Sequence, residues 1–265
     1  MGEIWIDGRE GSRIFDIEVS AGRIPHSSVV HKFGRNPDVD GDEDVWSAPT
    51  ADWVAPTAAA IHNIVSTDAN DDGDPVGSGA RTIEIQGLDA NFVFQKEPLT
   101  LNGTTDVPST KLYTRIFRMK CLTFGTTGWN EGTITATATS PSATTVTAQI
   151  EIKDAQTLMA IYTVPSGCTG YMTQYYASIN KVSGSSAGTV DVGLFFRERA
   201  DETDAGWVLK HIQGLNLVGS SRFDFRWKPT LQIPEKTDVK LRALNNSANN
   251  LDLSAGFSLI LELTP

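Results

Sequence analysis

The sequence predicts an all-β fold in which antiparallel strands form one large β-sandwich or two β-domains. Short runs of alternating apolar and polar residues recur from residue 45 to the end, and clusters of Gly, Pro, Asn and Ser separate them. The apolar spacing of three and four residues that an amphipathic helix needs is missing from these runs. With 265 residues and 40% hydrophobic content, the chain is long enough to bury a substantial core.

Residues 1–50 differ from the rest, because isolated apolar residues lie between Gly, Pro and charged residues, and an acidic run follows at residues 38–44. This composition predicts an extended N-terminal arm with little core of its own. Aromatic residues in irregular or Pro-rich segments commonly anchor a loop or a subunit contact. The candidate interface residues are therefore Trp5, Phe15, Phe33, Trp46 and Trp53.

The next segment, residues 52–65, is the best helix candidate. Asp52 is a suitable N-cap and the alanines at 58–60 favour helix, whereas Pro56 and β-branched neighbours oppose it, so both readings stay open. Residues 66–80 are rich in Asp and Gly and predict a loop. Residues 136–147 carry Thr, Ala, Ser and Pro, which suit either a small-residue strand or a linker.

The clearest strands have one apolar and one polar side. Residues 81–86 set Ile83 and Ile85 against polar neighbours, and residues 115–123 do the same with Phe117 and Met119. Further strands of this kind are expected at residues 171–178, 191–197, 207–212, 222–228, 238–243 and 257–264. About seven strands follow residue 150, which is what one sandwich requires. The expected domains are therefore a β-domain over residues 51–150 and a sandwich over residues 151–265.

Charge and apolar pattern limit the classes of partner. The formal net charge of −10 predicts a surface that repels nucleic acid and anionic membranes. No run of apolar residues is long enough to cross a membrane, and the first residues lack the pattern of a signal peptide. Cys121 and Cys168 form no paired motif and lie in apolar runs, so both are expected to be reduced and buried.

No sequence motif indicates catalysis or a cofactor. The histidines His26, His31, His62 and His211 show no metal-ligand spacing, and no phosphate-binding or nucleophile motif is present. His211 shares a predicted strand face with Trp207 and Leu209, so a core or interface histidine is expected there. We therefore expect a protein that is not an enzyme and needs no cofactor.

The best metal candidate is the acidic stretch at residues 68–74. Asp68, Asn70 and Asp72 place oxygen ligands at alternate positions before a glycine, as in the first half of a calcium loop. The twelfth position, where a bidentate carboxylate is needed, holds Gly79, which excludes an EF-hand. The expectation is a solvated acidic turn without metal, and an irregular calcium site is the alternative.

Several stretches resemble virion proteins of tailed phages, in particular those that decorate or cement the capsid shell. The stretches are ARTIEIQGLDANFVFQKEPLTLNG (80–103), YTRIFRMKCLTFGTTGWNEGTITAT (113–137), MAIYTVPSGCTGYMTQYYASINK (159–181), IPEKTDVKLRAL (233–244) and AGFSLILEL (255–263). Together they cover much of residues 80–265, and residues 1–50 do not share the resemblance.

The resemblance implies a jelly-roll-like sandwich in the later half and association as a small ring or homotrimer. It also implies attachment to the major capsid protein on the outer capsid surface of the virion, without enzymatic activity. The alternative is a receptor- or glycan-binding module of a phage head fibre or tail. That alternative needs an open aromatic face, for which the candidates are Trp46, Trp53, Trp129 and Trp207.

Overall fold

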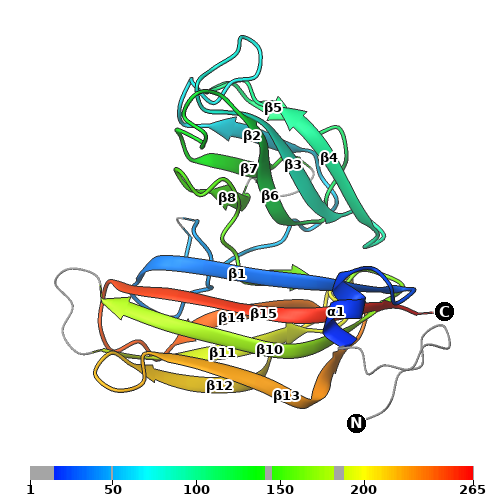
Figure 1. The fold of residues 1–265 in the computed structure, drawn as a ribbon, viewed down its shortest axis with the longest axis vertical. Helices are drawn as coiled ribbons and strands as arrows, with labels where there is room; N and C mark the ends of the chain where they lie inside the picture. The colour runs from blue at the N-terminus through cyan, green and yellow to red at the C-terminus, as the bar shows by residue number, and fades with distance from the viewer. Residues whose placement is uncertain (1–14, 49, 141–144, 182–187, 265) are drawn as a thin grey trace.

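The chain is almost entirely β-structure in the computed structural model, which describes residues 15–48, 50–140, 145–181 and 188–264 (Figure 1). Strands make up 56% of it and helix 2%, which confirms the all-β prediction. The elements are α1 (Phe15–Ser20), β1 (Ser27–Val39), β2 (His62–Ser66), β3 (Ala80–Leu88), β4 (Phe94–Thr100), β5 (Val107–Pro108), β6 (Arg115–Phe124), β7 (Ile134–Ala138), β8 (Val146–Ile150), β9 (Ile161–Thr163), β10 (Cys168–Lys181), β11 (Thr189–Arg197), β12 (Val208–Asn216), β13 (Arg222–Ile233), β14 (Asp238–Leu244) and β15 (Leu251–Leu263).

Eight strands form a two-layer sandwich from residues 27–48 and 158–264, which we call the sandwich lobe. One sheet has the order β1-β15-β10-β13 and the other β12-β11-β14-β9, and all their pairs are antiparallel. Along the chain, the first of these eight strands pairs with the last, the second with the seventh, the third with the sixth and the fourth with the fifth. Apolar side chains such as Tyr175, Phe196 and Phe257 fill the space between the sheets.

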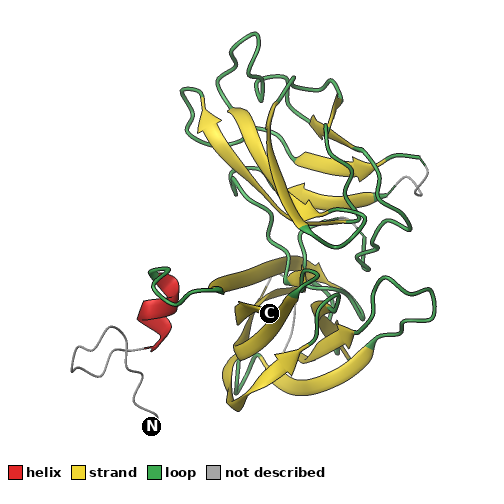
Figure 2. Cartoon of the chain, turned by 90° about the vertical axis from the view of Figure 1, so that its right-hand side faces the viewer, coloured by secondary structure: helices red, strands yellow, loops and turns green. Residues whose placement is uncertain are grey.

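Seven strands between β1 and β9 form a second body, the inserted lobe, over residues 53–157. Its sheets have the orders β5-β2-β7-β8 and β4-β3-β6. Their apolar sides face each other, with Ile64, Ile83, Ile85 and Met119 fully buried. Figures 1 and 2 show this lobe standing on the β1 side of the sandwich.

The prediction of an extended arm is wrong for residues 27–39, because they form β1, a full member of a sandwich sheet. It pairs with β15 from Ser27↔Glu262 to Val39↔Leu251. The burial pattern explains why alternation did not reveal it. In the middle of β1 the buried positions are Lys32, Gly34 and Asn36, and exposed Phe33 lies between them. The polar side chains therefore point inward, opposite to the usual pattern.

The open helix reading of residues 52–65 is wrong, because this segment holds no helix and ends in strand β2. Ala60 forms an isolated bridge with Tyr113, and Ile64 is fully buried as the centre of an alternating strand. The one helix of the described chain is α1, which lies in the segment expected to be an arm. Apart from its end residues, which belong to β2 and β3, the segment 66–80 holds no strand, as expected for a loop. Strands β7 and β8 flank residues 139–145.

The domain boundary lies a few residues after position 150, and the second domain is discontinuous. The loop after β8 still bonds to the inserted lobe, since Cys121 N donates to Ala155 O (2.8 Å) and Thr157 N to Met119 O (2.9 Å). Ala160 N then donates to Val45 O (2.9 Å) in the sandwich lobe. The sandwich therefore includes residues near 27–48 that precede the inserted lobe in the sequence.

The two lobes share buried contacts at their junction. Arg115 of β6 donates through Nε to Oδ1 of Asp238 on β14 (3.0 Å), and Arg197 donates through Nε to Oδ2 (2.9 Å). Burial alone would raise the pKa of Asp238, but the guanidinium groups of Arg115 and Arg197 hold this pKa below its usual value. Phe117 of the inserted lobe packs in the sandwich core, and Met159 packs in the core of the inserted lobe. The lobes are therefore joined by charge and by apolar packing.

Candidate functional site

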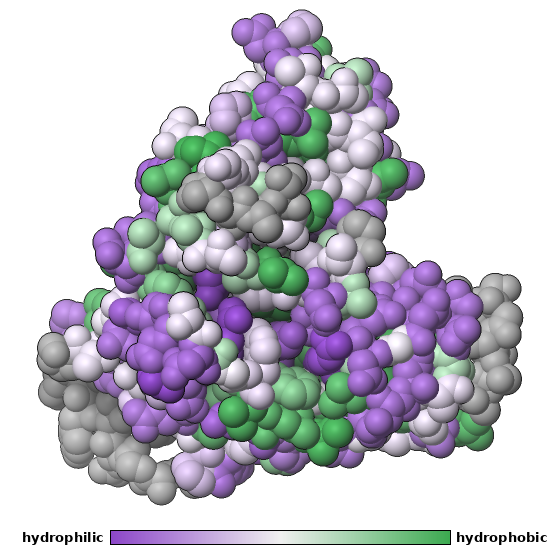
Figure 3. Space-filling view, turned by 180° about the vertical axis from the view of Figure 1, so that it is seen from behind, coloured by the Kyte–Doolittle hydropathy of each residue, from purple (hydrophilic) through white to green (hydrophobic). Residues whose placement is uncertain are grey.

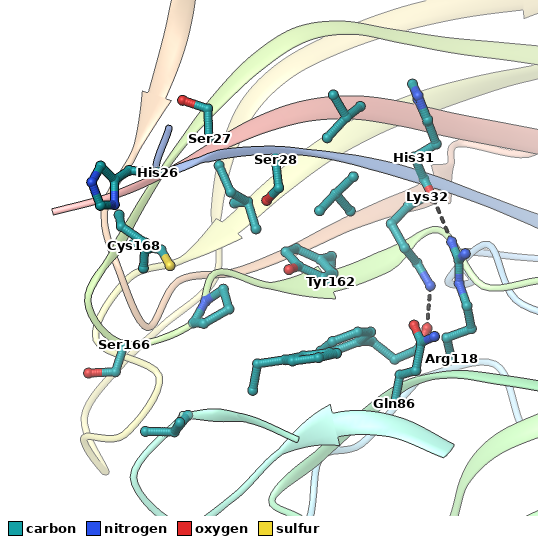
Figure 4. A pocket seen from close by; sticks show the side chains of 18 residues that line it. His26, Ser27, Ser28, His31, Lys32, Gln86, Arg118, Tyr162, Ser166 and Cys168 are labelled. Carbon is teal, nitrogen blue, oxygen red and sulfur yellow. Dashed lines mark hydrogen bonds between the residues drawn. The ribbon is translucent and has the colours of Figure 1, made fainter. Parts of the chain in front are cut away.

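A groove of about 560 Å³ lies between the two lobes (Figure 4). One wall is formed by His26 and the first half of β1, from Ser27 to Lys32, and the other by β3, β4 and β6 of the inserted lobe. Tyr162 of β9 and Cys168 of β10 line the groove from the sandwich lobe. The groove therefore exists only because the inserted lobe stands beside the free edge of β1.

One end of the groove carries two basic side chains, Lys32 and Arg118. Lys32 is only 2% exposed, and its Nζ donates to the carbonyl oxygen of Phe117. Burial lowers the pKa of Lys32 well below its usual value, and the neighbouring charge of Arg118 lowers it further. Arg118 Nη2 donates to His31 O (2.7 Å), and burial also lowers the pKa of Arg118. Figure 4 shows both basic side chains at this end, next to Gln86.

The centre of the groove is apolar and aromatic. Phe94 stacks on Phe117 with 6.1 Å between ring centroids, and Phe117 meets Tyr162 at 4.7 Å. Val93 and Phe94 are 50% and 47% exposed, so apolar surface is open to a ligand here. None of the eighteen described residues that line the groove is Asp or Glu, although the whole chain carries a net charge of −10. The groove is therefore suited to a ligand with apolar and anionic groups.

A second candidate surface lies on the outer side of the β12-β11-β14-β9 sheet. We call Phe195, Leu209, Ile212 and Leu244 the β12 face. They surround Gly193, whose missing side chain would contact Phe195, Leu209 and Leu244. Ile212 lies directly opposite Gly193, and Leu209 and Ile212 are 44% and 41% exposed. Figure 3 shows apolar residues gathered low on this side of the molecule. This surface offers an apolar contact area.

A register shift within β12 separates His211 from Leu209. The pairing passes from Leu194↔His211 to Phe195↔Leu209, so one extra residue lies between them. His211 Nδ1 is hydrogen-bonded to the Tyr175 hydroxyl, and the His211 ring lies 4.3 Å from Phe225 on the inner side. The expectation that His211 and Leu209 share a face is therefore wrong, because the bulge turns Leu209 outward.

No family model, curated protein or solved structure matches this chain.

The predicted interface residues divide into two groups. Trp46 and Trp53 are only 2% and 5% exposed, so their prediction as surface contacts is wrong. Their indole nitrogens donate to Thr50 O (2.8 Å) and Thr147 O (3.1 Å), so both rings anchor loops in the core of the inserted lobe. Phe15 and Phe33 are each 38% exposed on α1 and β1. Trp5 lies outside the described residues.

The acidic stretch at residues 68–74 forms a hydrogen-bonded turn. Asp68 Oδ1 accepts from Asn70 N (2.8 Å), and Asp72 Oδ1 accepts from Asp74 N (2.9 Å). Buried Asp71, which sequence reasoning did not select, accepts four hydrogen bonds that include the amides of Ala80, Glu131 and Gly132. The described residues contain no group of three or more His, Cys, Asp or Glu side chains placed to hold a metal.

The remaining predicted groups have structural surroundings. His62 is fully buried beside Tyr113, and Cys121 and Cys168 are free thiols, of which Cys121 is only partly buried. Within the described chain, no helix has the length and apolar character needed to cross a membrane. Sequence reasoning missed Lys32, Arg118, Leu209 and Ile212 as surface-forming residues. Only tertiary pairing brings them to the groove and to the β12 face.

Proposed function

We propose that this chain is a non-enzymatic structural protein that decorates the outer surface of a phage capsid and stabilises the assembled lattice. The observation that carries the proposal is the strand order of the sandwich lobe. Pairing of first with last, second with seventh, third with sixth and fourth with fifth strands is the order of an eight-stranded jelly roll. Jelly rolls are a common architecture of viral capsid proteins, and the proposed function rests on this likeness of architecture.

The β12 face supplies the contact area for the major capsid protein. Leu209 and Ile212 keep much of their apolar surface in contact with water, and burying it against a partner is favourable. A protein that binds the assembled lattice but not free subunits stabilises the shell by mass action. The net charge of −10 favours a position on the outside of the shell, away from packaged DNA.

The oligomer is proposed to be a trimer. A ring or trimer multiplies the contacts of one chain, so that weak individual contacts give strong attachment to a repeating lattice. Light scattering on the purified chain measures the mass directly. Three times the mass of the 28.7 kDa chain supports the trimer, and the mass of one chain contradicts it.

Co-sedimentation with phage heads that lack the protein tests the attachment. We expect the full chain to sediment with heads and not with free capsid subunits. Leu209→Asp and Ile212→Asp each place a charge in the β12 face and should weaken binding by about tenfold or more. Val218→Asp is the matched control, because Val218 is 77% exposed in the turn after β12 and outside this face. Heads that fail to bind the full chain, or that bind Leu209→Asp as tightly, contradict the proposal.

The glycan-binding alternative receives no support from the aromatic residues expected to form an open face. Trp46 and Trp53 are buried, and Lys240 lies 4.4 Å from the ring centroid of half-buried Trp207. Trp129 is 43% exposed, and Lys153 lies 5.5 Å from its ring centroid. Stacking of a sugar needs an open ring face. We therefore propose lattice attachment and not sugar recognition as the function.

A further inference from the structure

The groove between the lobes contains the free edge of β1. This strand is at one end of its sheet, and β15 is its neighbour there. His26 O accepts from Leu263 N (2.9 Å), which places the backbone groups of even-numbered residues on the β15 side. The groups of odd-numbered residues point the other way, and His31 O accordingly accepts from Arg118 Nη2 (2.7 Å). Each edge residue thus presents one N–H and one C=O to the groove.

Two of these edge residues lack partners. Ser27 and Val29 line the groove, and no described residue accepts from their amides or donates to their carbonyl oxygens on this side. An exposed strand edge of this kind pairs readily with another extended chain. The open edge favours a peptide, because a small amphiphile or a sugar does not match a row of alternating donors and acceptors.

The charge of the groove selects the kind of peptide. Lys32 is nearly fully buried, and the described residues give its three N–H donors a single acceptor, the carbonyl of Phe117. Two carboxylates, those of Glu84 and Glu235, accept hydrogen bonds from residues that line the groove, and both already have partners. Glu84 bonds Gln86 and pairs with Lys96 and Lys120, and Glu235 bonds Ser166. A carboxylate supplied by a ligand therefore meets Lys32 and Arg118 without a competing charge on the lining.

We propose that the groove binds an extended, acidic peptide segment of a partner protein, which adds as a strand to the free edge of β1. Its backbone pairs with Ser27 and Val29. A carboxylate side chain reaches Lys32 and Arg118, and apolar side chains on either side cover the exposed Val93 and Phe94. This site is separate from the β12 face, and the proposal does not depend on capsid attachment.

Fluorescence anisotropy with the full chain tests the binding. The probe is a fluorescein-labelled peptide of sequence Thr-Val-Glu-Val-Glu-Val-Thr, and the control peptide carries Lys in place of Glu. We expect saturable binding of the acidic peptide, weakened by about tenfold or more for the Lys peptide and by Arg118→Gln. Arg226→Gln is the matched control, because Arg226 is an exposed arginine on β13, away from the groove. Lys32→Met is a second groove variant.

Hydrogen exchange identifies the mode of binding. Strand addition should slow exchange of the Ser27 and Val29 amides on adding the acidic peptide. The amides of Ser28 and Val30, which already point toward β15, should keep their exchange rates. Absence of saturable binding overturns the proposal, as does equal binding to Arg118→Gln and the unaltered chain. Binding without protection at Ser27 and Val29 overturns the strand-addition mode.

Discussion

At the scale of single residues, the charged groups at the lobe junction matter most for stability. Asp238 is fully buried and receives hydrogen bonds from Arg115, Arg197 and Thr163, which come from both lobes. A second buried carboxylate, Asp44, pairs with Lys240 (2.8 Å) and Arg242 (3.1 Å) and accepts from the amide of Trp53. These carboxylates hold segments that are far apart in the sequence.

Asp238→Asn should strongly destabilise the fold. It removes the charge that compensates Arg115, whose side chain is only 4% exposed. Removing one partner of a buried ion pair leaves the other charge uncompensated and costs about 3–5 kcal/mol. Urea unfolding should show a free energy of unfolding lower by this amount. Asp224→Asn is the control, because this exposed carboxylate lies 3.9 Å from Arg226 and should change stability by less than about 0.5 kcal/mol. Equal effects of the two variants would refute the assigned role.

His62 should make the fold sensitive to mild acid. Burial lowers its pKa from 6.5 to about 4, and its Nδ1 contacts the carbonyl of Ala60 (3.1 Å) while Nε2 has no partner among described residues. As pH falls through the window from 6.5 to 4, the unfolded chain takes up this proton before the folded chain does, so stability falls. The loss reaches about 3 kcal/mol at pH 4.

Unfolding of the unaltered chain and of His62→Leu at pH 7 and pH 4.5 measures this contribution. Other carboxylates also respond to acid, so the difference between the two proteins is the relevant quantity. The stability lost between these pH values should be smaller by about 2–3 kcal/mol in His62→Leu. The same loss in both proteins would show that His62 is not responsible.

At the scale of elements, β1 depends on a close approach at Gly34. A side-chain carbon at this position would lie 2.3 Å from Val45 O and 2.4 Å from Ala160 N. The amide of Ala160 donates a hydrogen bond to the carbonyl oxygen of Val45 (2.9 Å). These two residues lie where the chain enters and leaves the inserted lobe. The glycine therefore allows β1 to pack against both crossing segments.

Gly34→Ala should separate β1 from these segments and lower the free energy of unfolding by about 1–3 kcal/mol or more. Gly41→Ala is the matched control, because a carbon added at Gly41 has no atom within 4 Å. Urea midpoints of the two variants provide the comparison. If Gly34→Ala is as stable as Gly41→Ala, the close approach does not limit the packing of β1.

At the scale of the whole molecule, the two cores are interlocked. Leu88, Phe92 and Phe117 of the inserted lobe pack in the sandwich core, and Trp46, Met159 and Ile161 pack in the core of the inserted lobe. Arg115 and Asp238 add a buried ion pair between the lobes. Each lobe thus completes the core of the other.

The lobes are therefore expected to unfold together. Tryptophan fluorescence and far-UV circular dichroism should give superimposed urea curves with one midpoint, as in a two-state transition. The described tryptophans lie in both lobes, for example Trp53 in the inserted lobe and Trp227 in the sandwich lobe, so fluorescence reports on both. Two separated transitions would show that the junction contacts do not couple the lobes.

The alternation of apolar and polar residues predicted most of the strands, and it failed at particular residues. Ile83 and Ile85 face the core of the inserted lobe, Val192 and Leu194 face the sandwich core, and their strands have the expected positions. β1 was missed because Lys32, Gly34 and Asn36 occupy its buried side. Neither candidate surface was predictable, because the free edge of β1 and the bulge beside Leu209 depend on strand pairing.

The sequence by itself determined the strand content of the chain, the apolar side of most strands and its acidic character, because these follow from local alternation and composition. The tertiary structure decided that residues near β1 close the sandwich, that Trp46 and Trp53 are buried, and that Lys32 meets Arg118 in a groove between the lobes. These features depend on contacts between residues far apart along the chain. Local periodicity carries no information about which strands pair, and pairing sets which side chains face one another.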